Sequence, residues 1–147
     1  PHCALFINDR IDIAMAIGAD GIHLPESSWP ATLARRVFPN FTYGVSVHSL
    51  EGAFMKSEMQ VDFIVFGPVF DTPSKQAMGM TATGIEALRD VCSAVTIPII
   101  AIGGMTPKRA ALCRNAGAHG VAVMSDLLMA SSLTERMAAY REELGSL

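Results

Sequence analysis

The fold of this chain is decided by the stretch Ile99-Ile100-Ala101-Ile102-Gly103-Gly104-Met105-Thr106-Pro107. Its four leading apolar residues predict a buried strand, and the two glycines predict a tight turn directly after that strand. Thr106 followed by Pro107 is typical of a helix start, where threonine caps the helix and proline occupies the first turn. The stretch therefore reads as strand, turn and helix, which is the order of one βα unit.

Five other short apolar runs are each followed by a polar or glycine-rich turn, and segments with helical spacing lie between them. The runs are Leu5–Asn8, Gly21–Leu24, Tyr43–Ser46, Phe63–Gly67 and Gly120–Ser125. The helical segments cover about residues 10–17, 30–38, 49 onward, 86–95, 106–117 and 132–144. This alternation predicts an α/β protein with a parallel sheet of six βα units, two short of a closed eight-stranded barrel.

Composition bounds the size and the partners of the protein. The 147 residues are 50% hydrophobic and 17% charged, which suits one domain over residues 1–147 with a sheet covered on both faces. A net charge of −3 without a basic cluster argues against nucleic acid and anionic membranes as partners. No signal peptide and no membrane-spanning run of about 18 apolar residues is visible, so we predict a cytoplasmic protein. The sequence leaves open whether the protein forms a homo-oligomer.

Cysteine usage fits the same compartment. The three cysteines, Cys3, Cys92 and Cys113, are widely spaced and form no zinc-binding pattern with histidine. We expect them to be reduced thiols that act as small apolar residues.

The last two strand ends favour an anion site. Gly103 and Gly104 let the backbone approach a ligand, and the helix that starts at Thr106 directs backbone N–H groups to the same place. Met124 and Ser125 end the next run, and barrels often bind phosphate with the loops after their last two strands. The alternative is that these glycines serve only the turn.

The longest irregular stretch, residues 67–83, follows the end of a strand and therefore favours a functional loop. Thr72, Ser74 and Lys75 supply two hydroxyls and an ammonium group, a reasonable clamp for an anion. A solvated lysine is the alternative.

Three strand ends in the first half carry other chemistry. His48 lies just beyond a strand, where an imidazole could act as a general acid or base or could only support the loop. His23 alternates with Ile22 and Leu24, and a packed core histidine is favoured over one that points into a barrel. Asp9 could hold Mg²⁺ or could cap the following helix.

Taken in order, six motifs resemble the thiamine phosphate synthase/TenI family. They are residues 6–10, 19–24, 44–49, 66–75, 101–106 and 120–125. The resemblance runs in unbroken order to about Ser131 and implies a (β/α)₈ barrel of the TIM type. It also implies ligands that are small phosphorylated thiazole and pyrimidine precursors of thiamine.

By this resemblance, the first strand of this chain aligns with the third strand of the family barrel. Two βα units, with a basic motif that helps to hold the pyrimidine pyrophosphate, would then precede Pro1. We therefore expect a fragment that covers strands three to eight, exposes two sheet edges and is inactive by itself. A genuine open-sheet protein of this length is the competing interpretation.

Two activities share this family. For the synthase, the resemblance implies that Asp9 binds Mg²⁺ and that the second metal aspartate is replaced by Ser28. It also implies substrate or phosphate contacts from Asn8, Ser46, Thr72, Ser74, Lys75, Gly104, Met124 and Ser125. For the thiazole tautomerase, no metal is needed and the residue matching His48 moves the proton.

The stretches 23–25, 46–51 and 66–70 look closer to the tautomerase branch. We therefore predict thiazole tautomerase activity, an isomerisation that aromatises the thiazole carboxylate phosphate, with His48, Ser46 and Asn8 as catalytic residues. The alternative is a Mg²⁺-dependent thiamine phosphate synthase, a transferase that releases pyrophosphate. A further alternative is a non-catalytic protein that binds a phosphorylated ligand.

Overall fold

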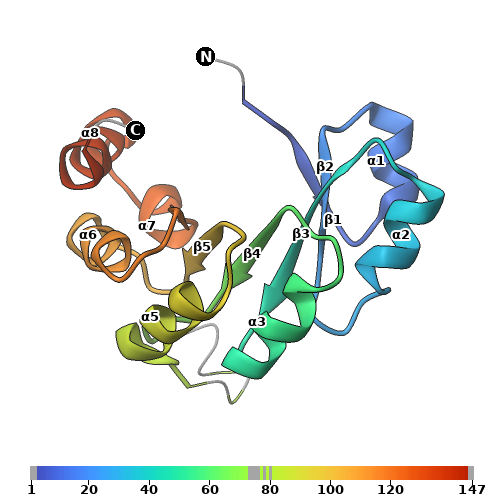
Figure 1. The fold of residues 1–147 in the computed structure, drawn as a ribbon. Coiled ribbons are helices and arrows are strands. Elements are labelled where there is room, and N and C mark those ends of the chain that lie inside the picture. Colours follow the sequence, from blue (N-terminus) through green and yellow to red (C-terminus); the bar gives the residue numbers. More distant parts are fainter. Residues whose placement is uncertain (1–2, 73–76, 78, 80, 146–147) are drawn as a thin grey trace.

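The computed structural model describes residues 3–72, 77, 79 and 81–145. Figure 1 shows strands and helices in alternation along the chain. The strands are β1 (Phe6–Asn8), β2 (Gly21–Leu24), β3 (Thr42–Val47), β4 (Phe63–Phe66), β5 (Ile99–Ile102) and β6 (Gly120–Ala122). The helices are α1 (Ile11–Ile17), α2 (Ala31–Val37), α3 (Leu50–Ser57), α5 (Gly84–Ala94), α6 (Pro107–Asn115), α7 (Ser125–Leu128) and α8 (Leu133–Leu144).

The six strands form one parallel sheet in the order β1-β2-β3-β4-β5-β6. The sheet curls into an arc, and α1, α2, α3, α5 and α6 lie on its convex side (Figure 1). Because each strand pairs with the next one along the chain, every helix crosses over in the same sense, as in a barrel. The predicted architecture of six βα units of a (β/α)₈ barrel is therefore confirmed.

The convex face of the sheet carries the hydrophobic core. Ile22, Tyr43, Ile64 and Ala101 on this face are fully buried beneath the helices. The described part of the chain has no buried polar or charged residue, so the core depends on apolar packing.

The concave face has a different composition, because successive side chains of a strand point to opposite faces. It carries the aromatic rings of Phe6 and Phe63, which meet edge to face at 5.3 Å between ring centres. Gly21 and Gly44 leave room for these rings, since a Cβ on either glycine would lie 2.2 Å from a ring carbon. The rings fill the concave side next to the polar residues Asn8, His23 and Ser46.

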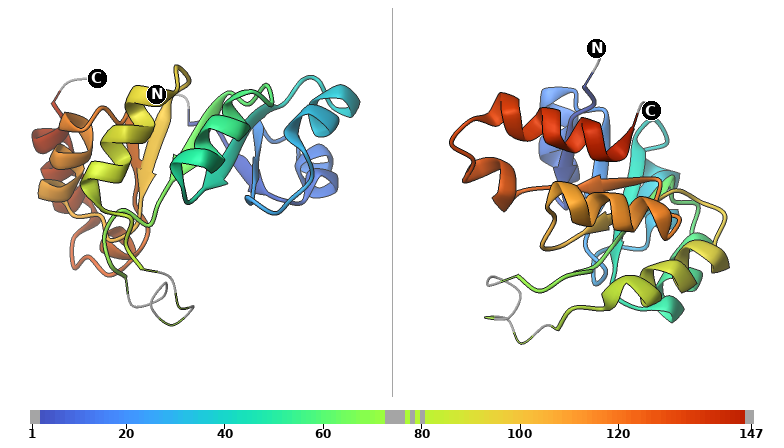
Figure 2. Two further views of the ribbon diagram at one scale, coloured as in Figure 1. Left: turned by 60° about the horizontal axis from the view of Figure 1, so that its bottom comes forward. Right: turned by 90° about the vertical axis from the view of Figure 1, so that its left-hand side faces the viewer.

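Most element bounds lie within one or two residues of the sequence prediction, and two differences fall in the carboxyl half of the chain. Helix α5 begins at Gly84, two residues before the predicted start. Strand β6 ends at Ala122, and Ser125 opens the short helix α7, which the apolar run to Ser125 did not indicate. Helix α7 leads into α8, which packs beside α6 (Figure 2). No helix in the described ranges has the length and the hydrophobicity needed to cross a bilayer.

Candidate ligand site at the carboxyl ends of the strands

A pocket lies where β4, β5 and β6 end. It is lined by the predicted residues Thr72, Gly103, Gly104, Met124 and Ser125, together with Asp71, Ile102, Met105, Ala122 and Asp126. Its open volume of about 210 Å³ is several times the ~30 Å³ that one water occupies in the liquid. A pocket of this size suits a phosphate group with a small ring.

The turn between β5 and α6 forms one wall of the pocket and is built for close backbone approach. Gly103 and Gly104 have φ angles of 102° and 60°, and a Cβ on Gly103 would lie 2.6 Å from the Cα of Pro68. Thr106 caps α6 by accepting a hydrogen bond from the backbone N–H of Arg109. The Nη1 of Arg109 donates in turn to the carbonyl of Gly104 at 2.7 Å. The turn is therefore fixed by the helix that follows it.

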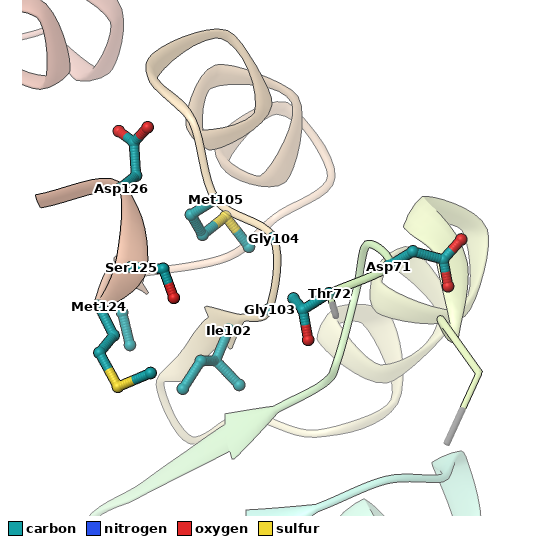
Figure 3. A pocket seen from close by; sticks show the side chains of 10 residues that line it. Asp71, Thr72, Ile102, Gly103, Gly104, Met105, Met124, Ser125 and Asp126 are labelled. Atoms are coloured by element: carbon teal, nitrogen blue, oxygen red, sulfur yellow. The ribbon is translucent and has the colours of Figure 1, made fainter. Parts of the chain in front are cut away.

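The loop after β4 forms the opposite wall. The Thr83 backbone N–H and hydroxyl both donate to the carbonyl of Pro68, at 2.8 and 3.1 Å, and close the loop at its base. Figure 3 shows the side chains of Thr72 and Ser125 on opposite sides of the Gly103–Gly104 turn, whereas the carboxylates of Asp71 and Asp126 project outward. The hydroxyls favour an anion, and the negative charge of Asp126 is offset because its carboxylate accepts from the hydroxyl of Tyr140 and lies 3.6 Å from Arg136.

The other two predicted loop residues, Ser74 and Lys75, lie outside the described residues. Their part in an anion clamp therefore stays a prediction.

A row of polar side chains lies on the concave face at the ends of β1, β2 and β3. The Nδ1 of His23 lies 3.1 Å from the Oδ1 of Asn8, and its Nε2 lies 3.1 Å from the Oγ of Ser46. Burial lowers the pKa of His23, because the charged imidazolium loses solvation. His23 was expected to be a packed core residue. The structure instead places it between two predicted site residues, so that expectation is wrong.

The end of β1 brings Asp9 to the same edge of the sheet. Asp9 adopts a left-handed backbone conformation, with φ of 60°, and its backbone N–H donates to the carbonyl of His23. Its carboxylate accepts a hydrogen bond from the hydroxyl of Ser28, the residue that replaces the second metal aspartate in the family resemblance. Arg10 precedes α1, and no side chain caps that helix. The alternative role of Asp9 as a helix cap is therefore wrong.

His48 takes part in a separate set of contacts. Its Nδ1 hydrogen-bonds the carbonyl of Gly67, and its Nε2 lies 4.0 Å from the carboxylate of Glu26. Lys56 on α3 holds the same loop through the carbonyl of Glu26, at 2.9 Å. His48 thus links the ends of β3 and β4 to the loop after β2, and it does not line the pocket around Gly103.

Comparison with known proteins shows the family and the fold. The family model described as thiamine monophosphate synthase matches residues 2–127. The thiamine-phosphate synthases of Archaeoglobus fulgidus and Chloroflexus aurantiacus are 40% and 39% identical over 95% and 88% of this chain. The chain spans 64% and 60% of the length of these two relatives.

A solved structure gives the same result for the fold. The thiamine phosphate pyrophosphorylase from Pyrococcus furiosus superposes with a TM-score of 0.87 and 32% sequence identity. The match covers 97% of this chain and 67% of that protein. These matches agree with the order of the βα units and with the family motifs at the strand ends. The chain therefore belongs to the thiamine monophosphate synthase family.

Proposed function

We propose that the protein is a thiamine phosphate synthase, which joins a pyrimidine pyrophosphate and a thiazole phosphate and releases pyrophosphate. The observation that carries this proposal is that two groups of polar contacts share one edge of the sheet. The pocket lies at β4–β6, and the polar row with Asp9 lies at β1–β3. A reaction that joins two precursors needs two neighbouring binding places, whereas an isomerisation needs one.

The pocket is the proposed place of the thiazole phosphate. The backbone of Gly103 and Gly104 and the hydroxyls of Thr72 and Ser125 are suited to phosphate oxygens, because N–H and O–H groups are the donors that an anion requires. Met124 and Ile102 offer apolar contacts to the ring at the mouth of the same pocket. Ser74 and Lys75 remain proposed phosphate contacts in the same loop.

The polar row is the proposed place of the pyrimidine, with Asn8 and Ser46 as its contacts. Asp9 and Ser28 fit a partial Mg²⁺ site, because Mg²⁺ commonly takes one or two carboxylates and completes its shell with water and substrate phosphates. The described residues hold no cluster of three or more His, Cys, Asp or Glu side chains, so substrate phosphate would supply the remaining charge. Bound Mg²⁺ would neutralise charge on the departing pyrophosphate.

The tautomerase interpretation receives less support. Both relatives named above are synthases at about 40% identity. The ring of His48, which would move the proton in a tautomerase, is bonded through Nδ1 to a backbone carbonyl and lies outside the pocket. We therefore assign His48 the role of holding three loops together.

The test is a coupling assay on the full-length protein with both precursors, with and without EDTA. We expect thiamine phosphate to form with Mg²⁺ and its formation to stop with EDTA. A protein that makes no thiamine phosphate but aromatises the thiazole carboxylate phosphate in EDTA would establish the tautomerase instead. Saturable binding of precursors without turnover in either assay would establish a non-catalytic binder.

A further inference from the structure

The three polar residues of the concave face form a chain of hydrogen bonds that crosses three strands. Asn8 ends β1 and pairs in register with His23 on β2. Ser46 lies on β3, two residues after Gly44, the register partner of His23. Both ring nitrogens of His23 are engaged at 3.1 Å, one by Asn8 and one by Ser46. The imidazole is thus fixed in orientation from both sides.

The chemistry of the partners determines where the imidazole proton lies. The Oδ1 of Asn8 is a carbonyl oxygen and can only accept, so Nδ1 of His23 must carry the hydrogen. In the neutral ring, Nε2 then holds a lone pair and can only accept. The hydroxyl of Ser46 must therefore donate its single hydrogen to Nε2, which leaves only lone pairs on Oγ for a ligand.

The surroundings keep the ring in this neutral form. The two side chains bonded to it, Asn8 and Ser46, are uncharged. Asp9 follows Asn8 but is bonded to Ser28, and His48 lies beyond Ser46 but is bonded to Gly67.

We propose that His23 is a positioning residue. It makes the hydroxyl of Ser46 an obligate hydrogen-bond acceptor toward the ligand in the proposed pyrimidine-binding site. Ser46 then selects a heterocycle that presents an N–H donor, such as an exocyclic amino group, and disfavours one that presents only acceptors. This inference rests on the proposed function for the identity of the precursor. The proton position in the ring does not depend on that function.

The proton position is tested by ¹⁵N NMR of the histidine side chains in the full-length protein without substrate, with His23→Asn identifying the signal. We expect the Nδ1–H tautomer for His23 at neutral pH. The Nε2–H tautomer, or an average of the two forms, would overturn the inference even if the protein proves to be a synthase.

The selection is tested by calorimetry with pyrimidine pyrophosphate and, separately, with thiazole phosphate. His23→Asn keeps a donor for Asn8 but removes the acceptor for Ser46, and we expect it to weaken pyrimidine pyrophosphate binding about tenfold, the order of one neutral hydrogen bond. His23→Gln can present an oxygen near the Nε2 position, so it should restore binding to within about threefold. Thiazole phosphate binding should change less than about twofold in either variant.

Equal losses in the Asn and Gln variants, or equal losses for both precursors, would show that His23 only supports the fold. Thermal melts of both variants separate a folding defect from a binding defect. An inactive wild-type protein that shows the Nδ1–H tautomer and this binding pattern would contradict the synthase proposal and leave the inference standing.

Discussion

Single side chains at the strand ends determine how the concave face can bind ligands. Asp9 illustrates this, because its backbone at φ of 60° turns the chain so that its carboxylate meets Ser28 from the next loop. Asp and Asn adopt this left-handed conformation more readily than most residues with a Cβ. The residue type at position 9 therefore serves both the turn and the proposed metal.

Exchanging Asp9 for Asn separates these two roles. Asn tolerates the same backbone conformation, so we expect the free energy of unfolding to change by less than about 0.5 kcal/mol. Loss of the carboxylate should lower the Mg²⁺-dependent coupling rate by about a hundredfold, because Ser28 alone offers no charge. Urea unfolding and coupling rates across a Mg²⁺ titration measure the two effects.

Gln60 provides the control for Asp9, since it too has a positive φ, of 56°, and precedes β4 at the opposite end of the sheet. Gln60→Gly should stabilise the protein by about 1 kcal/mol and leave the Mg²⁺ titration unchanged. A coupling rate that survives in Asp9→Asn would remove Asp9 from the metal site.

Sequence analysis named Asp9, Asn8 and Ser46 as candidate site residues, but it favoured a core position for His23 and did not group it with them. His23 stands in a strand between Ile22 and Leu24, and a parallel sheet is commonly apolar on both faces, so the pattern does not show which face is open. Only the register of β1, β2 and β3 brings the three side chains together. This information depends on pairing between strands and is absent from any single motif.

At the scale of elements, the pocket depends on helices that hold its turns. The motif from Ile99 to Pro107 predicted β5, the glycine turn and the start of α6, because each step has a local cause. Helix α7 was missed because the apolar residues that precede it continue the pattern of β6. Local patterns thus predict an element where capping and turn residues mark its ends, and fail where an apolar run crosses a boundary.

Arg109 couples α6 to the glycine turn and to the loop after β4. Its guanidinium donates to the carbonyl of Gly104 and lies 4.7 Å from the centre of the Phe70 ring. Arg109→Lys keeps the charge but loses the planar group that makes both contacts, so thiazole phosphate binding should weaken about three- to tenfold by calorimetry. Arg114→Lys on the same helix is the control, because the guanidinium of Arg114 donates to the carbonyl of His119, which precedes β6 at the end of the sheet opposite the pocket. Equal effects from both variants would contradict this role.

Tyr140 couples α8 to α7, which begins at Ser125. Its hydroxyl donates to the carboxylate of Asp126 at 2.9 Å. Burial is the main cause that raises the pKa of Tyr140, and the hydrogen bond to Asp126 is the second cause. Tyr140→Phe should cost about 1.5 kcal/mol in urea unfolding, because the lost bond has a charged acceptor. It should also weaken thiazole phosphate binding, since Asp126 follows Ser125.

Tyr43→Phe is the matched control for Tyr140→Phe. Tyr43 donates to the carbonyl of Phe38 at 2.9 Å, far from the pocket in sequence and in the sheet order. Its loss should cost about 1 kcal/mol in unfolding and leave phosphate binding unchanged. A weakened phosphate affinity in Tyr43→Phe would mean that general destabilisation explains the Tyr140 result.

At the scale of the whole molecule, the core is apolar and its few titratable groups are held neutral. Burial raises the pKa of Cys113 to about 11 and also raises the pKa values of Tyr43 and Tyr140. Above pH 9 the unfolded chain loses protons that the folded chain keeps, so the free energy of unfolding falls as the pH rises. We therefore expect the folded protein to lose stability at alkaline pH.

Urea unfolding between pH 7 and 11 tests this prediction. Cys113→Ala should lower stability at pH 7 by leaving a small cavity, but should flatten the decline between pH 9 and 11. Cys3→Ala is the control, since Cys3 is exposed and its change should leave both the stability and the slope unchanged. An unaltered slope in Cys113→Ala would show that Cys113 is not the titrating group.

The central claim, that this protein joins two precursors, is tested most directly by pyrophosphate release from the full-length protein with Mg²⁺. We expect no release with either precursor alone, and with both we expect one pyrophosphate for each thiamine phosphate formed. The absence of pyrophosphate when both precursors and Mg²⁺ are present would contradict the account.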